Sequence, residues 1–249
     1  MRRAAAALVA VGALALTGCT AAPDHDEPAA PSFDVDRYDP EHPGNGLWLV
    51  PADEVIAQVT HAVRESPSVR YSGTVTELIT PAEGDPHPGR TITVEYEGSA
   101  DARRATLRAD DVRSEVVTVD GDTYVRGNGA YAAQIGTPEV TSGWVCVRSA
   151  EALLADWAPL LDPADLVESL LTGAESIAVM EPPADAERTT IYLGTGDSPQ
   201  GKLTVSSVGA PLPHDFVAGD VSGDGRFSFQ DWGAEVAVAA PTPVVVTCG

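Results

Sequence analysis

The chain has 249 residues and a formal net charge of −22 at pH 7, because 37 acidic residues outnumber 15 basic ones. A surface this acidic repels the phosphates of nucleic acids and of anionic membranes, so binding to either through a basic patch is disfavoured. Residues 47–249 are numerous enough to form one domain with a sizeable core, and we expect a single domain there.

The N-terminus has the pattern of a secretory signal. Two arginines precede an apolar run over residues 4–16, which is shorter than the roughly 20 residues needed to span a bilayer. The run ends in Leu16–Cys19 (LTGC), which resembles the lipobox of bacterial lipoproteins. The resemblance implies a signal peptide over residues 1–18 and acylation of Cys19, with palmitate for example. The protein would then be anchored at the extracytoplasmic face of the cell membrane, since two or three acyl chains hold a protein stably.

A tether is predicted between the anchor and the domain. Residues 19–46 are rich in Pro, Ala and Asp and contain too few apolar residues to form a core of their own. A Pro-rich chain is semi-extended, at about 3 Å per residue, so this segment could hold the domain several tens of Å from the membrane.

Cys146 and Cys248 remain once Cys19 is acylated. An even pair of cysteines in an oxidising compartment predicts a disulfide, which would close a loop of roughly a hundred residues. The alternative is a pair of buried free thiols. No C-x-x-C pattern is present, so a zinc site at these cysteines is not expected.

The first elements of the domain are a helix and a hairpin. Pro51 and two acidic residues behind it favour a helix start, and Ser66-Pro67 ends the helix. Its apolar residues recur at helical spacing and are Val55, Ile56, Val59, Ala62 and Val63. The period changes to two from Val69 to Val75 and again around Val94 and Tyr96, which predicts two strands joined by a long loop.

Strands and helices alternate in blocks along the rest of the chain. Further strands are predicted over 104–108, 112–119, 123–125 and 143–147, with tight turns at Asp120-Gly121 and Asn128-Gly129. Two helices follow. One runs through Leu153, Leu154 and Trp157, and the other begins at Asp162-Pro163 and runs through Leu166, Val167, Leu170 and Leu171. Short strands are then predicted over 176–180, 189–193, 202–208, 215–218, 225–229 and 235–239. This order predicts an α+β fold with one large antiparallel sheet that is covered on one face.

Several short segments resemble actinobacterial lipoproteins of the LppX/LprG family. They are Ser68–Gly73 (SVRYSG), Val119–Arg126 (VDGDTYVR), Gly143–Val145 (GWV), Leu161–Leu166 (LDPADL) and Asp231–Gly233 (DWG). The presence of only one lysine among many arginines also fits a high-GC, actinobacterial genome. The resemblance implies a strongly curved antiparallel sheet, an unclosed half-barrel with helices on its concave face, similar to the LolA and LolB carriers. The tail after Pro243 departs from the family and could narrow the mouth of a cavity.

In that family an apolar cavity between helices and sheet holds the acyl chains of lipids or glycolipids. Each buried methylene contributes about 0.8 kcal/mol, so an acyl chain binds without any catalytic group. The residues expected to line such a cavity are Val55, Ile56, Val59, Val63, Val94, Tyr96, Leu153, Leu154, Trp157, Leu166, Leu170 and Leu171. Each of them could equally be an ordinary core residue, so the sequence leaves open whether the interior is hollow or filled.

A calcium loop competes with a plain hairpin near the C-terminus. Oxygen-bearing residues have the spacing of an EF-hand loop and are Asp220, Ser222, Asp224, Ser228 and Asp231. The final position lacks the usual Glu, and no helix is predicted before the loop, so we favour a hairpin turn and expect no metal cofactor.

No catalytic motif is present, since H-E-x-x-H, G-x-S-x-G and P-loop patterns are all missing. The sequence therefore predicts a non-enzymatic, monomeric, membrane-anchored protein that binds acyl chains and transfers or presents them. The alternative is a non-enzymatic envelope module with a filled core that binds another protein, with or without a stabilising calcium ion in the 220–231 loop.

Overall fold

The structure is a computed structural model that describes residues 44–79, 81, 85, 87–99, 101–147, 155–195, 198–220 and 223–248. All of these described residues belong to one compact unit, which contains every described helix and strand. No helix in this described part is long and apolar enough to cross a membrane. The predicted signal peptide, Cys19 and most of the predicted tether lie outside the described residues.

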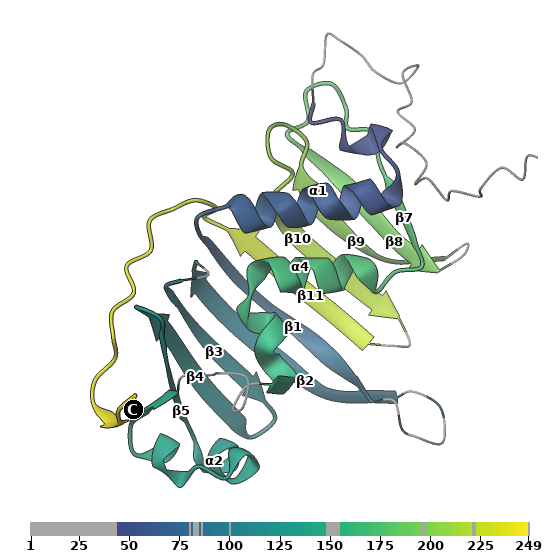
Figure 1. Cartoon of the computed structure of the whole chain (residues 1–249). Coiled ribbons are helices and arrows are strands. Elements are labelled where there is room, and N and C mark those ends of the chain that lie inside the picture. Colours follow the sequence, from purple (N-terminus) through teal and green to yellow (C-terminus); the bar gives the residue numbers. More distant parts are fainter. Residues whose placement is uncertain are drawn as a thin grey trace, which may run out of the picture. The chain divides into compact units, whose positions relative to one another are not determined.

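Twelve strands form one sheet in the order β12-β6-β5-β4-β3-β2-β1-β11-β10-β9-β8-β7 (Figure 1). The strands are β1 Val69–Ile79, β2 His87–Gly98, β3 Arg103–Ala109, β4 Val112–Val119, β5 Asp122–Gly127, β6 Trp144–Val147, β7 Ser176–Val179, β8 Arg188–Thr195, β9 Ser198–Ser206, β10 Pro213–Asp220, β11 Gly223–Gln230 and β12 Val244–Val246. Strands β12 and β7 each have one neighbour, so the sheet is unclosed. All pairs are antiparallel except β12 with β6, which is parallel. The predicted α+β half-barrel, with helices on the concave face of a strongly curved sheet, is confirmed.

Residues far apart in sequence meet at the centre of the sheet. Strand β1 pairs with β11 from Arg70 opposite Gln230 to Val75 opposite Gly225, and with β2 on its other side. Residues 234–241, in contrast, contain no strand, so the prediction of a strand over 235–239 is wrong. The last strand is β12, which lies at the edge of the sheet beside β6.

Helices and helical turns connect the strands. They are η2 Leu47–Leu49, α1 Ala52–Glu65, α2 Gly129–Ile135, η3 Pro138–Thr141, η4 Ala155–Leu161 and α4 Pro163–Thr172. Helix α4 begins where expected, because Oδ1 of Asp162 accepts hydrogen bonds from the backbone N–H groups of Ala164 and Asp165, at 2.9 and 3.1 Å. Helix α2 was missed, since Asn128-Gly129 predicted a turn; the Asn128 side chain instead caps the helix by accepting from the N–H of Tyr131.

Helices α1 and α4 lie side by side over one face of the sheet, which we call the inner face (Figure 1). Strand residues alternate between the inner face and the opposite, outer face. On β2, for example, Val94 is fully buried on the inner face whereas Glu95 is exposed on the outer one. The buried inner-face residues, together with those of α1, η4 and α4, form a single hydrophobic cluster.

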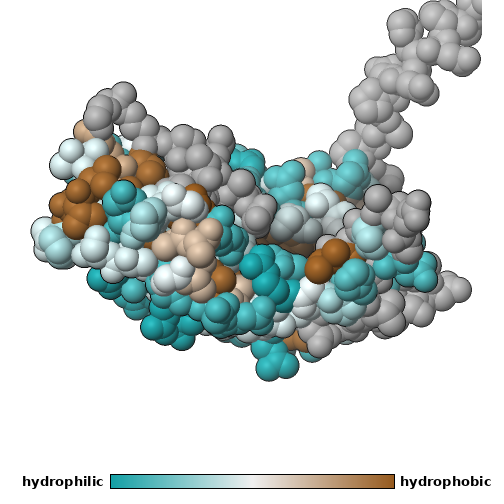
Figure 2. Space-filling view, turned by 90° about the horizontal axis from the view of Figure 1, so that it is seen from below, coloured by the Kyte–Doolittle hydropathy of each residue, from teal (hydrophilic) through white to brown (hydrophobic). Residues whose placement is uncertain are grey.

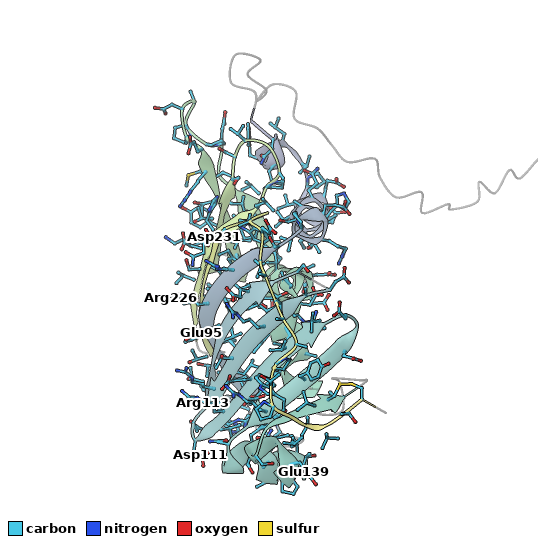
Figure 3. All side chains as sticks on the ribbon, turned by 90° about the vertical axis from the view of Figure 1, so that its left-hand side faces the viewer. Glu95, Asp111, Arg113, Glu139, Arg226 and Asp231 are labelled. Carbon is cyan, nitrogen blue, oxygen red and sulfur yellow. A yellow bond between two sulfur atoms is a disulfide. The ribbon has the colours of Figure 1, made fainter. Side chains whose placement is uncertain are left out.

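The middle of the C-terminal tail, residues 238–244, packs on the outer face. Figure 3 shows the tail in yellow, running past the strands. A second, small cluster of Val117, Val119 and Trp144 is buried there against Val238 and Val244. The tail is held at its end by the β12–β6 pairing and by a disulfide between Cys146 and Cys248, with their Cα atoms 5.0 Å apart. The predicted disulfide is therefore present in the structure. It joins residues 102 positions apart.

Candidate functional site

The inner face is the first candidate site, because it brings together most of the residues predicted to line a lipid cavity. Those buried in its cluster are Val55, Val59, Val63, Val94, Tyr96, Trp157, Leu166 and Leu171. Ile56 and Leu170 are partly buried against the same cluster, whereas Leu153 and Leu154 lie outside the described residues. The lining of a cavity and the packing of a core use the same side chains, so these positions remain candidate lipid contacts.

Two tyrosines stack at the centre of the inner face. The rings of Tyr71 (β1) and Tyr96 (β2) lie 4.4 Å apart and nearly parallel. The hydroxyl of Tyr71 donates to the carbonyl oxygen of Leu160 at 2.6 Å, and that of Tyr96 donates to the carbonyl oxygen of Ser99 at 3.1 Å. Burial raises the pKa of both phenols, so both stay protonated and neutral. Tyr71 was not predicted as a site residue, although its alternation with Val69 and Gly73 placed it on the inner face.

A further group of polar atoms lies at the β4 end of the inner face. Tyr131 of α2 stacks on Trp157 of η4, with ring centroids 6.0 Å apart. Ser114 of β4 has no exposed surface and lies on the same side of its strand as Val112 and Val116. Burial raises the pKa of Tyr131, and the nearby Ser114 hydroxyl offsets part of this rise. Sequence reasoning missed Tyr131 and Ser114, because α2 was not predicted and a serine inside a strand carries no signal of burial.

A recess lies between α1, the loop that precedes β10 and the residues that follow β11. Its volume is about 560 Å³, and its lining residues are Gln58, His61, Ala62, Glu65, Ser66, Pro67, Ala210, Pro211, Leu212, Trp232 and Gly233. The Trp232 ring stacks on Phe229, at 6.1 Å between centroids, and its indole N–H donates to the carbonyl oxygen of Pro213 at 2.7 Å. The ring is thus fixed as one wall of a mostly apolar recess.

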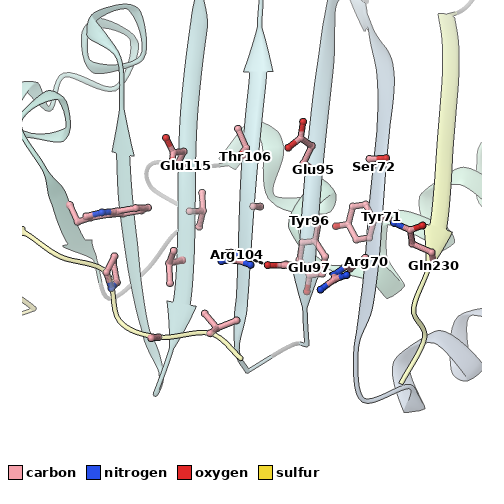
Figure 4. Close-up of a pocket in the computed structure, with 17 residues that line it drawn as sticks. Arg70, Tyr71, Ser72, Glu95, Tyr96, Glu97, Arg104, Thr106, Glu115 and Gln230 are labelled. Carbon is pink, nitrogen blue, oxygen red and sulfur yellow. Dashed lines mark hydrogen bonds and ion pairs between the residues drawn. The ribbon is translucent and has the colours of Figure 1, made fainter. Parts of the chain in front are cut away.

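The outer face carries a groove of about 560 Å³ between the strands and the tail (Figure 4). Arg70 binds Glu97 and Asp231, at 2.9 and 3.0 Å, and Arg104 also pairs with Glu97. On β5, Arg126 pairs with Glu115 at 2.6 Å, and its guanidinium lies 4.7 Å from the centre of the Trp144 ring. These charges partner one another across neighbouring strands. Figure 2 shows a largely hydrophilic surface on which hydrophobic side chains gather in separate patches.

The predicted calcium ligands do not form a wrapped loop in the described residues. Asp220 and Gly223 are the last pair of the β10–β11 hairpin, and the chain is extended from Gly223 to Gln230. Asp231, the final predicted ligand, binds Arg70 instead. Ser222 and the side chains of Asp220 and Asp224 lie outside the described part, and Ser228 belongs to β11.

One other group of potential metal ligands is present among the described residues. It consists of Asp122, Cys146 and Cys248, whose ligand atoms lie within 4.8 Å of one another. Both sulfur atoms are joined in the disulfide, and a disulfide lacks the thiolates that bind metals. We therefore assign no metal to this group.

Comparison with known proteins gives similarity to solved structures alone, because no protein-family model and no curated protein matches the chain. LprF from Mycobacterium bovis is 13% identical, with 76% of this chain and 96% of that chain covered and a TM-score of 0.43. LppX from Mycobacterium tuberculosis is 14% identical, with 74% of this chain and 96% of that chain covered and a TM-score of 0.42. MucB in complex with MucA(peri) is 18% identical, with 79% of this chain and 62% of that chain covered and a TM-score of 0.33.

The resemblance stated from the sequence is thus matched by mycobacterial lipoproteins, LppX among them. Identities below 20% and TM-scores below 0.5 assign neither a family nor a function to this chain. A function has to be argued from the chain's own inner face.

Proposed function

We propose that this protein is a lipid-anchored extracytoplasmic carrier, which binds the acyl chains of lipids or glycolipids between its helices and the inner face of its sheet. The single observation that carries the proposal is the nature of that face. It is apolar from Leu193 of β8 to Val145 of β6, and it is covered by helices. The carrier would transfer or present its cargo in the cell envelope.

A helical cover suits reversible binding for a physical reason. The strands are held together by ladders of backbone hydrogen bonds, whereas α1 and α4 are held on the sheet by side-chain packing. Lifting a helix therefore breaks apolar contacts but leaves the sheet intact. An acyl chain that enters replaces those contacts, at about 0.8 kcal/mol for each methylene removed from water.

The anchor and the tether complete the proposal. The lipobox-like Leu16–Cys19 would attach the chain to the membrane that supplies or receives the lipid. The Pro-rich residues behind it would let a monomeric domain reach beyond that surface. No cofactor is needed, because the bound lipid is the cargo.

Native mass spectrometry combined with lipid extraction tests the proposal. Residues 31–249 hold every described element and would be purified under mild conditions from an actinobacterial host. We expect mass adducts that extract as acylated lipids. Leu170→Asp, at a partly buried position of α4, should weaken them by introducing a charge at the inner face.

Val217→Asp is the matched control, since Val217 of β10 is 37% exposed and lies on the outer face. It should fold and retain the adducts. An apo mass for the unaltered protein, together with no uptake of added glycolipid or fatty acid, would rule the carrier function out.

The recess beside α1 supports a second candidate function, a module that binds another envelope protein. Its apolar walls, formed by Leu212, Pro211 and the fixed Trp232 ring, suit an apolar side chain of a partner. This function would leave the interior filled. If this function holds instead of the carrier function, the same mass spectra should show lipid-free protein. Leu212→Asp should then abolish capture of the partner protein. A calcium-stabilised version would also unfold at a lower temperature in chelator.

A further inference from the structure

The indole N–H of Trp157 is a buried hydrogen-bond donor without an acceptor among the described residues. The side chain is 2% exposed and belongs to the inner-face cluster, where it stacks on Tyr131. A buried donor that leaves water and gains no partner lowers stability, so native proteins seldom keep one. The position of Trp157 therefore points to an acceptor that arrives with a ligand.

The surroundings of Trp157 restrict the chemistry of that acceptor. The cluster to which it belongs includes apolar side chains of β4, β5, η3 and η4, such as Val116, Val125, Val140 and Leu161. The phenol of Tyr131 is neutral, because burial raises its pKa. A neutral oxygen attached to a hydrocarbon fits such an environment, whereas an ionised carboxylate would be costly to bury there.

We propose that Trp157 recognises the ester carbonyl at the head of a bound acyl chain by donating its indole N–H to the carbonyl oxygen. This inference rests on the proposed carrier function and makes it more specific. The apolar inner face would accept any hydrocarbon of suitable length, since methylene burial does not distinguish esters from ethers. The unpartnered indole N–H of Trp157 would favour lipids whose chains are ester-linked.

The test compares two lipids that differ only at this group. Dimyristoyl phosphatidylcholine carries ester carbonyls, and its di-O-tetradecyl ether analogue lacks them; myristate serves as the free-carboxylate arm. Each is added to ¹⁵N-labelled residues 31–249, which contain all four tryptophans. We expect the Trp157 indole N–H resonance to shift downfield with the ester lipid, as it gains an acceptor, and to lack this shift with the ether.

Trp157→Phe identifies the resonance and removes the donor while keeping a ring against Tyr131. We expect it to weaken binding of the ester lipid about three- to tenfold, the range for one hydrogen bond, and to leave the affinity for the ether lipid unchanged. Trp232→Phe is the matched control, because the Trp232 N–H already donates to Pro213 and its loss should not separate the two lipids.

The possible outcomes distinguish failure of ester recognition by Trp157 from failure of the carrier function. Binding of ester and ether lipids with equal affinity, and without a specific shift of the Trp157 resonance, overturns the ester inference and leaves the carrier function standing. A shift with myristate alone assigns the donor to a carboxylate and also overturns it. Absence of binding by all three lipids refutes both proposals. Should Trp157→Phe fail to fold, the resonance of the unaltered protein decides the question alone.

Discussion

The inner and outer faces of the sheet are built by the same strands but are held together differently. On β3, Leu107 is fully buried against the inner cluster, and its neighbour Arg108 is exposed on the outer face. The inner face has a cover of helices and one continuous apolar cluster. The outer face has cross-strand ion pairs and a tail fixed by a disulfide.

This difference indicates which face of the sheet can exchange its contacts for contacts with a ligand. Apolar packing has no fixed direction, so the inner face can exchange side-chain contacts for lipid contacts at little cost. The outer face depends on a covalent link and on charges with defined partners, so it would resist such exchange. We therefore expect ligand binding to depend on the inner face and the outer tail to act mainly on stability.

The largest effect is expected from the disulfide. Replacing Cys146 and Cys248 together by Ala should lower the free energy of unfolding by about 4–5 kcal/mol, because the bond closes a loop of roughly a hundred residues in the unfolded chain. Urea unfolding measures the loss. Lipid binding should persist in the double variant, because neither cysteine belongs to the inner-face cluster.

Reduction of the unaltered protein is the control, and it should give the same loss of stability as the double variant. An unchanged unfolding midpoint after complete reduction would show that the tail is already held by the β12–β6 pairing and its apolar contacts. A loss of lipid binding on reduction would break the separation between the two faces.

The next effect compares neighbouring residues of β3. Leu107→Ala should cost about 2–5 kcal/mol, because it leaves a cavity in the inner cluster. Arg108→Ala, one residue along the same strand, should change stability by less than about 0.5 kcal/mol. Urea unfolding of the two variants measures the contrast. Comparable losses would mean that the outer face contributes to stability far more than its exposure suggests.

A smaller effect is expected at the start of α4, part of the helical cover. Asp162→Ala removes the acceptor for the N–H groups of Ala164 and Asp165 and should cost about 1 kcal/mol. Asp162→Asn retains a capping oxygen and should lower the free energy of unfolding by only a few tenths of a kcal/mol. If both variants lose the same stability, the charge of Asp162 matters more than its cap.

Local patterns predicted much of this fold. Alternation of apolar residues in β1 and β2, the helical period of α1 and the Asp162-Pro163 start of α4 are signals that lie within a few residues of one another. The Asp120-Gly121 turn is another, because both residues adopt positive φ, at 55° and 82°, as a tight hairpin requires. The even pair Cys146 and Cys248, in a chain whose start has the pattern of a secretory signal, sufficed to predict the disulfide.

What the sequence could not predict depends on contacts between distant residues. Nothing local in β1 indicates that Arg70 lies opposite Gln230, or that the tail runs along the outer face as an extended segment instead of adding a strand over 235–239. The same holds for the candidate site. Trp157 was predicted at the inner face from its apolar spacing, but its unpartnered N–H and its stacking on Tyr131 follow from the meeting of η4 with an unpredicted helix.

The smallest effect is expected from His214, near the start of β10, where the pairing of β10 with β9 is irregular. Burial and the nearby Arg188 lower its pKa below the ordinary 6.5, and its Nε2 lies 3.0 Å from the hydroxyl oxygen of Ser206. The folded state thus favours neutral His214. Its contribution to stability should be complete above about pH 6.5 and should fall as the pH drops toward the folded-state pKa, because the unfolded chain binds the proton first.

Two measurements check the lowered pKa of His214 and its effect on stability. An NMR titration should give a His214 midpoint below 6.5. Urea unfolding at about pH 5 and about pH 8 should show a larger acid-induced loss for the unaltered protein than for His214→Gln, which keeps a polar side chain near Ser206 but cannot be protonated in this range. An equal loss in both proteins would place the acid sensitivity in other groups, and a midpoint above 6.5 would reverse the expected sign. Either result would mean that this end of β10 is more open to water, or closer to Asp215, than its packing indicates.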